Sequence, residues 1–221
     1  MELALVMGSI FLPGFVMNPF VAALRERGLP SVWFAPPIAG DADAVAATYA
    51  EAAVRTEATT LIVHSNAGNY VPAVVAESRA QRVVFIDAII PPLAGGAWPA
   101  VPEGVRDAFA ETERDGILPP WTRWWPAEQV RALFPDGTTF ARVDAVAPAV
   151  PLSYLSSHLR ADPGWADGLA CSYVAFGAGY ADEITVATGA GWPVRTLDLG
   201  HLGMVQDPAL VAETVLPLAT T

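Results

Sequence analysis

The segment that decides the fold is Thr59–Gly68, which reads TTLIVHSNAG. Its first half is an apolar, β-branched run of the kind that forms a buried strand, and a helical pattern follows at Val71–Arg79. Ser65 therefore lies where a strand turns sharply into a helix, and Ala67 is small enough for the backbones at such a turn to approach each other. We interpret Ser65 as a nucleophile on a strand-to-helix elbow, with Val63 in place of the usual first glycine. A serine that caps the helix is the alternative.

Strands and helices alternate in both directions from this segment. Further apolar runs predict strands at Leu3–Met7, Ser31–Phe34, Arg82–Ile86, Ser172–Phe176 and Val194–Leu197. Helical patterns lie between them at Met17–Arg27, Asp41–Glu57, Asp182–Ala190 and Pro208–Leu218. Continuous apolar strands that alternate with helices are typical of a parallel sheet covered on both faces. We expect an α/β fold with a doubly wound, mostly parallel six-stranded sheet and helices on both faces.

The periodicity fails between residues 91 and 163, a stretch rich in proline that holds four of the seven tryptophans. Long insertions in such folds are usually functional. We therefore expect a cap or lid at 91–163, inserted into a core made of residues 1–90 and 164–221. The sequence WTRWW places three large rings beside charged residues, which predicts an aromatic wall that contacts substrate: Trp121, Trp124 and Trp125. The alternative is an irregular connection that packs its aromatic rings on the core.

Composition excludes several classes of function. Acidic residues outnumber basic residues 23 to 12, so the net charge of −11 disfavours nucleic acid and anionic membrane surfaces as partners. All twelve basic residues are arginines, which excludes lysine-based Schiff-base chemistry and a phosphate-binding P-loop lysine. One cysteine and three histidines are too few for a Cys/His zinc cluster. We expect no metal and no organic cofactor.

Hydropathy predicts a protein outside the membrane. The apolar N-terminal run has no basic region before it, and no stretch reaches the roughly 20 uninterrupted apolar residues that a spanning helix needs. We expect a soluble, cytoplasmic protein.

His201 is the candidate general base. It lies in the segment GHLGM, directly after the last predicted strand, and follows Ser65 in the chain. His64 precedes the serine and is interpreted as a packing or hydrogen-bonding neighbour. His158 is interpreted as a surface or cap residue.

The chain as a whole resembles a compact α/β-hydrolase of the small esterase and hydroxynitrile-lyase branch. Five segments carry the resemblance: LALVMG at 3–8, HSNAGNY at 64–70, VVFIDA at 83–88, YVAFGAGYADE at 173–183 and GHLGM at 200–204. The resemblance implies a serine–histidine–carboxylate triad. It also implies an oxyanion hole formed by the backbone N–H of Asn66 and that of Ser9 or Ile10.

The position of the triad acid is open. The resemblance places it about three residues after Gly177, where this chain has Tyr180, and Asp182 and Glu183 lie just beyond. Some lipases carry the acid after the strand that follows the nucleophile helix, which here is Asp87. We favour Asp87, because it follows an unbroken apolar run and a partly desolvated carboxylate gains from an imidazole partner. Asp182 and then Glu183 are the alternatives, although helix capping alone would account for Asp182.

These features predict a serine-dependent hydrolase, namely an esterase, thioesterase or lactonase that acts on a small apolar acyl substrate. Ser65 would attack the acyl carbon and His201 would take its proton. One alternative is a lyase or cyclase of a biosynthetic pathway, in which the Ser–His pair acts as general base without an acyl-enzyme. Another is a pseudo-enzyme that binds a ligand in the same pocket.

Overall fold

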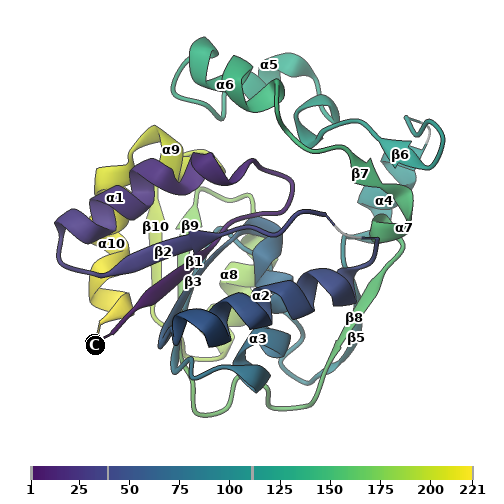
Figure 1. The fold of residues 1–221 in the computed structure, drawn as a ribbon. Coiled ribbons are helices and arrows are strands. Elements are labelled where there is room, and N and C mark those ends of the chain that lie inside the picture. Colours follow the sequence, from purple (N-terminus) through teal and green to yellow (C-terminus); the bar gives the residue numbers. More distant parts are fainter. Residues whose placement is uncertain (1, 39, 111, 221) are drawn as a thin grey trace.

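A central parallel sheet organises the chain in the computed structural model, which describes residues 2–38, 40–110 and 112–220 (Figure 1). Its six strands have the order β10-β9-β4-β3-β1-β2, and every neighbouring pair is parallel. Their bounds are β1 Ala4–Met7, β2 Ser31–Phe34, β3 Thr60–His64, β4 Arg82–Ile86, β9 Ala170–Phe176 and β10 Val194–Leu197. The predicted six-stranded α/β fold is confirmed.

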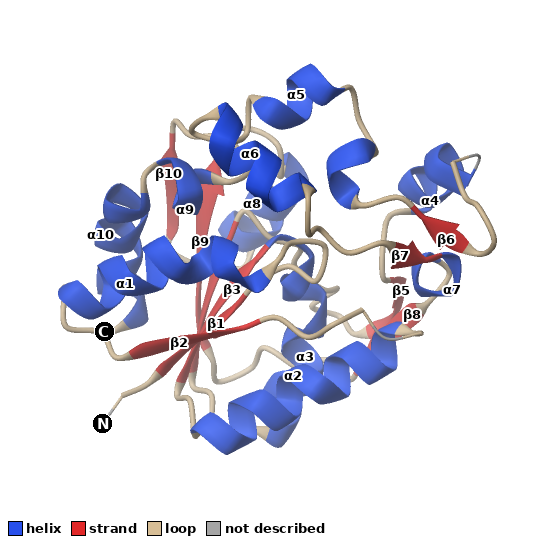
Figure 2. Cartoon of the chain, turned by 45° about the horizontal axis from the view of Figure 1, so that its top comes forward, coloured by secondary structure: helices blue, strands red, loops and turns tan. Residues whose placement is uncertain are grey.

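Helices cover both faces of this sheet (Figure 2). One face is covered by α1 (Asn18–Glu26), α9 (Gly203–Gln206) and α10 (Pro208–Ala219), and the other by α2 (Ala42–Thr56), α3 (Val71–Glu77) and α8 (Ala181–Gly189). The side chains of β4 alternate between the two layers: Val83 and Phe85 join the α2, α3 and α8 layer, whereas Val84 and Ile86 join the other. The central strands are therefore buried on both faces, as their continuous apolar sequences predict.

Local sequence signals account for the helix starts. The Asp41 side chain caps α2 by accepting a hydrogen bond of 2.8 Å from the Ala44 N–H. Pro72 lies in the first turn of α3, where its missing N–H costs no helical hydrogen bond. Each predicted strand or helix of the core ends within two residues of its predicted position.

Residues 91–163 contain short elements instead of a regular layer. They form two small antiparallel pairs, β5 (Gly96–Pro99) with β8 (His158–Ala161) and β6 (Ile117–Leu118) with β7 (Val150–Pro151). The helical pieces are α4 Glu103–Ala110, η3 Trp121–Arg123, α5 Ala127–Arg131, α6 Gly137–Asp144 and α7 Leu152–Leu155. Figure 1 shows this teal and green segment along the top and right of the molecule, with α5 and α6 above α1. Among the described residues, no helix has both the length and the apolar character to cross a bilayer.

Candidate active site

Ser65 lies on a strained elbow at the carboxyl end of the central strand β3. The strand passes directly into a 3-10 helix, η2 (Ser65–Tyr70), and the backbone φ of Ser65 is +59°. A positive φ is unfavourable for a residue other than glycine and is concentrated at functional sites. The turn also requires a glycine at position 68, since an added Cβ there would lie 2.0 Å from the carbonyl oxygen of Ile89. The small residue that the elbow depends on is therefore Gly68, one position beyond the one the sequence pattern indicates.

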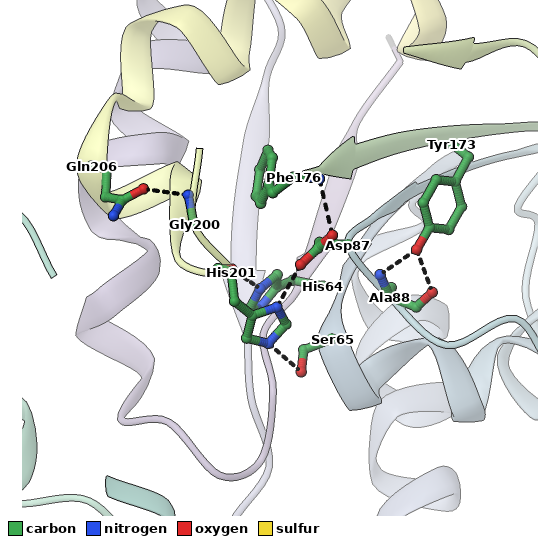
Figure 3. A network of polar contacts seen from close by, with 9 residues as sticks. All are labelled: His64, Ser65, Asp87, Ala88, Tyr173, Phe176, Gly200, His201 and Gln206. Atoms are coloured by element: carbon green, nitrogen blue, oxygen red, sulfur yellow. Dashed lines mark hydrogen bonds and ion pairs between the residues drawn. The ribbon is translucent and has the colours of Figure 1, made fainter. Parts of the chain in front are cut away.

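A continuous line of hydrogen bonds connects Ser65, His201 and Asp87 (Figure 3). The Nε2 of His201 lies 3.0 Å from Ser65 Oγ, and its Nδ1 lies 2.7 Å from Asp87 Oδ2. The other Asp87 oxygen accepts a hydrogen bond of 2.9 Å from the Phe176 N–H. Because Asp87 is only 1% exposed, its carboxylate is held by these two donors in a dry environment. The structure thus brings together the three residues predicted to form the triad.

The carboxylate alternatives lie elsewhere. Asp182 is exposed in the first turn of α8, and Tyr180 occupies the N-cap position, so the capping role suggested for Asp182 is wrong. Glu183 lines the cavity described below, and burial raises the pKa of its carboxyl group. Asp87 follows β4 with a φ of +43°, a conformation that aspartate tolerates better than most residues. Within the described part of the chain, Asp87 is the carboxylate bonded to His201.

The loops that carry His201 and Asp87 are both held by side chains (Figure 3). The Gly200 N–H donates to Gln206 Oε1 over 2.8 Å, which closes the turn that presents His201. The Tyr173 hydroxyl accepts from the Ala88 N–H over 3.0 Å and donates to the Ala88 carbonyl over 2.9 Å. Neither support could be predicted from the sequence, because both depend on contacts between residues that no local pattern connects.

Two rings pack against His201, one tilted and one stacked. His64 lies with its ring centroid 4.8 Å away, and its Nε2–H donates to the His201 carbonyl over 2.9 Å. Burial, together with the neighbouring His201, lowers the pKa of His64 well below 6.5, so His64 is neutral. Tyr180 stacks at 5.5 Å, and burial raises the pKa of its phenol, which keeps it protonated. The sequence signal for Tyr180 was its place three residues after Gly177, where the resemblance implies an acid. His158, the third histidine, is exposed on β8.

One of the proposed oxyanion donors, the Ile10 N–H, is engaged by the Asn66 side chain. Asn66 Oδ1 accepts from the Ser9 hydroxyl over 3.1 Å and from the Ile10 N–H over 3.4 Å. All three residues are buried, and Asn66 also lines the cavity. The structure therefore places all three predicted residues together beside Ser65. Their role in binding an oxyanion stays a prediction.

A cavity of about 660 Å³ opens beside Ser65. Polar side chains contribute to its lining, namely Ser65, Asn66, Asp87, Gln129, Tyr180, Glu183 and His201. The rest of its wall is mainly apolar and includes Phe11, Ile89, Val101, Trp121, Trp124, Trp125, Val130, Leu133 and Phe176. The three predicted tryptophans all line it, Trp124 from a buried position and Trp125 with 39% of its surface exposed. An apolar cavity with a few convergent polar groups is typical of a small-molecule site.

The described residues hold no group of three or more His, Cys, Asp and Glu side chains that could bind a metal ion. Cys171 is buried in the core, and burial raises the pKa of its thiol to about 12. The thiol is thus unreactive at neutral pH.

Comparison with known proteins gives matches in structure only. No protein-family model matches this sequence, and no curated protein matches it. An extracellular α/β-hydrolase from a Paenibacillus species, described as homologous to tobacco salicylic acid binding protein 2, is 16% identical over the whole of both chains, with a TM-score of 0.72. A pyrethroid hydrolase is 15% identical, with a TM-score of 0.72 over 99% of this chain and 97% of its own. Tomato methylketone synthase I is 10% identical, with a TM-score of 0.70 over the same shares. The chain therefore has the α/β-hydrolase fold over its whole length.

Proposed function

We propose that this protein is a serine-dependent hydrolase that cleaves an ester, thioester or lactone with an apolar acyl group. The observation that carries the proposal is the hydrogen-bonded series Asp87–His201–Ser65. Its last member, Ser65, lies on a strained elbow and lines the apolar cavity. Solved neighbours of the same fold include a polyneuridine aldehyde esterase and a pyrethroid hydrolase. These two neighbours support hydrolytic chemistry on this fold, while the substrate of this chain is inferred from its own cavity.

The hydrogen bonds set the direction of proton transfer. Asp87 accepts from Nδ1–H of His201, which leaves a lone pair on Nε2 directed at the Ser65 hydroxyl. His201 takes the proton as Oγ bonds to the acyl carbon, and the tetrahedral intermediate forms. The imidazolium then gives that proton to the leaving oxygen or sulfur, and the acyl-enzyme remains. Water activated by the same imidazole releases the acid and restores Ser65.

The tetrahedral oxyanion is assigned to backbone donors beside the elbow. The N–H of Asn66 follows the nucleophile, and the Ile10 N–H points toward the Asn66 side chain in the resting protein. One such donor contributes roughly 3–4 kcal/mol to transition-state stabilisation in comparable sites. In the proposed mechanism, the Ile10 N–H therefore exchanges its hydrogen bond to Asn66 Oδ1 for one to the oxyanion.

Residues 91–163 are proposed to act as the cap that selects the substrate. They supply the three tryptophan rings of the cavity wall, and the cavity volume of about 660 Å³ is in the range of sites for small organic molecules. Aromatic side chains bind apolar groups through large buried area and lose little conformational entropy. We therefore assign the apolar acyl group to this wall and the scissile carbonyl to the Ser65 end. The cytoplasmic location stays a prediction.

A panel of 4-nitrophenyl esters from acetate to decanoate tests the proposal. We expect kcat/KM to rise with acyl length until the cavity is filled, and Ser65→Ala to abolish turnover without loss of folding. A Ser65→Ala protein that keeps more than about a tenth of the wild-type rate would exclude the nucleophile role, because removal of such a serine costs roughly 10⁶-fold.

One observation favours a second candidate, a lyase or cyclase. The Ile10 N–H is already engaged by Asn66 Oδ1, and elimination by a general base does not require a two-donor oxyanion hole. In that case Ser65 and His201 would move a proton without forming an acyl-enzyme. Turnover of an elimination substrate such as an aromatic cyanohydrin, with no burst or turnover on any ester, would favour this candidate over the hydrolase.

A further inference from the structure

The Asn66 side chain is hydrogen-bonded at both its oxygen and its nitrogen. It is 4% exposed, and its oxygen accepts from the Ser9 hydroxyl and the Ile10 N–H. Its amide nitrogen donates to the Tyr154 hydroxyl over 2.8 Å. Because two donors face the oxygen and a hydroxyl faces the nitrogen, the amide has one satisfied orientation. A side chain that only filled space beside the nucleophile would not need this polar arrangement, which is costly to bury unless it is satisfied.

The loop that carries the second oxyanion donor is tied to its surroundings at several points. The Tyr49 hydroxyl donates to the Gly8 carbonyl, and the Phe11 N–H donates to Ser9 Oγ over 3.3 Å. Asn66 adds the connection from this loop to the elbow itself, one residue after Ser65. The distance between the two sides of the oxyanion hole is therefore set by the Asn66 amide.

Tyr154 connects this arrangement to the cavity wall. It is fully buried in α7, and its hydroxyl lies 2.5 Å from that of Tyr70, which fixes its position. The Tyr154 ring packs edge-on against Phe11 at 5.8 Å, and Phe11 packs against Trp124 at 5.3 Å. Phe11 and Trp124 both line the cavity. An apolar group bound on this wall would contact Phe11, which packs on the Tyr154 ring whose hydroxyl accepts from Asn66.

We propose that Asn66 is a positioning residue that sets the oxyanion hole and couples it to the substrate-contacting wall through Tyr154. The proposal rests on the hydrolase function given above and assigns a role within it. The Ile10 N–H is held by a neutral amide oxygen over 3.4 Å, which is a long hydrogen bond. An anionic oxygen attracts the same donor more strongly, because charge-assisted hydrogen bonds are about twice as strong as neutral ones. The donor therefore moves to the substrate when charge develops, and this favours the transition state over the ground state.

Asn69 provides a matched control for substitution of Asn66. It is an equally buried asparagine three residues later in η2, and its side chain also has both ends satisfied. Its nitrogen donates to the Ala100 carbonyl over 3.0 Å, and its oxygen accepts from the Trp98 indole over 2.9 Å. Asn69→Ala thus removes a similar buried amide from the same helix without touching the loop at Ser9 and Ile10.

The test compares Asn66→Ala, Asn69→Ala and Tyr154→Phe on the best 4-nitrophenyl ester of the panel. For Asn66→Ala we expect kcat to fall roughly 10- to 100-fold with KM within about twofold, since one donor is misplaced rather than removed. The affinity for an alkylboronic acid, which forms a tetrahedral adduct on Ser65, is expected to fall by the same factor. Asn69→Ala should lose comparable thermal stability and keep kcat within about twofold. Tyr154→Phe should show a smaller loss that does not add to that of Asn66→Ala, because it acts through the same residue.

Hydrogen exchange at the Ile10 N–H gives a readout without substrate. We expect faster exchange in Asn66→Ala than in Asn69→Ala. Wild-type kcat in Asn66→Ala, an equal kcat loss in Asn69→Ala, or unchanged exchange at Ile10 would each overturn the proposal. A wild-type protein that neither hydrolyses esters nor reacts with a fluorophosphonate at Ser65 would instead contradict the hydrolase function itself, and the Asn66 role with it.

Discussion

The substitution Asp87→Asn tests the most specific feature of the site. Asparagine has the same shape, and it tolerates the positive φ of +43° at this position, so the backbone is not perturbed. The Phe176 N–H requires an acceptor, so the carboxamide oxygen stays on that side and the NH₂ group faces His201 Nδ1. Nδ1 must then accept a hydrogen bond, which places the ring proton on Nε2. The lone pair that should take the Ser65 proton is lost.

The size of the effect follows from two contributions. Restoring the active tautomer would leave a buried polar group unpaired, at a cost of about 1–3 kcal/mol. The imidazolium formed during reaction would also lose its charge-assisted bond to a carboxylate 2.7 Å away, a further 1.5–3 kcal/mol approximately. Because each 1.36 kcal/mol changes a rate about tenfold, the sum corresponds to roughly 10²- to 10⁴-fold. The equivalent change in serine proteases, about 10⁴-fold, lies at the upper end.

The assay is kcat/KM on the best 4-nitrophenyl ester, with Asp182→Asn as the control. Asp182 is an exposed aspartate in α8, so its substitution makes the same change in charge away from His201. We expect Asp182→Asn to match the wild type. An Asp87→Asn protein within tenfold of the wild type, or a loss confined to Asp182→Asn, would refute the assignment of Asp87.

Three further predictions concern residues around the triad. Trp125→Ala should raise KM for long-chain esters by roughly 5- to 150-fold, because about 1–3 kcal/mol of apolar contact is lost, and it should leave acetate turnover unchanged. Trp33 is similarly exposed but lies on the edge strand β2, so Trp33→Ala should leave both quantities unchanged. Equal effects of the two substitutions would contradict a substrate-binding wall. His64 is neutral in the folded protein and protonates near pH 6.5 when unfolded, so folding stability should fall by up to about 1.4 kcal/mol per pH unit as the pH drops from 6.5 toward the lowered pKa of the folded state. The free energy of unfolding in urea should depend less on pH in His64→Gln than in the wild type, because glutamine does not titrate. The same pH dependence in both proteins would refute this prediction. Tyr180→Phe keeps the ring stacked on His201 and should retain activity within about tenfold of the wild type. Tyr180→Leu removes the ring and should lose more activity. The reverse order in a steady-state assay would show that the hydroxyl, and not the ring, is required.

The core of the fold could be predicted because its signals are local. Apolar runs such as Arg82–Ile86 are continuous since both faces of the parallel sheet are buried, and capping residues such as Asp41 mark where helices begin. Residues 91–163 gave no such signal, because their helices and strands are two to eight residues long and too short to show a period. Aromatic composition alone indicated that this segment contributes to the cavity wall.

The candidate site was predictable where chain position determines geometry. Ser65, Asp87 and His201 each follow a strand of the same parallel sheet, so their side chains meet at its carboxyl edge. The surrounding contacts could not be predicted, since Asn66 and Tyr154 are 88 residues apart and meet only after the chain has folded. The sequence showed only that Tyr180 stands where the resemblance implies the triad acid. Its stacking on His201 depends on packing that no local pattern encodes.

The most direct test of the central claim is covalent labelling of Ser65. A fluorophosphonate reacts with a serine only when its hydroxyl is activated, and peptide mass spectrometry identifies the labelled residue. We predict stoichiometric labelling at Ser65 in the wild type, much slower labelling in His201→Ala, and none in Ser65→Ala. A folded wild-type protein that is not labelled at Ser65, or that is labelled equally fast without His201, would contradict the account.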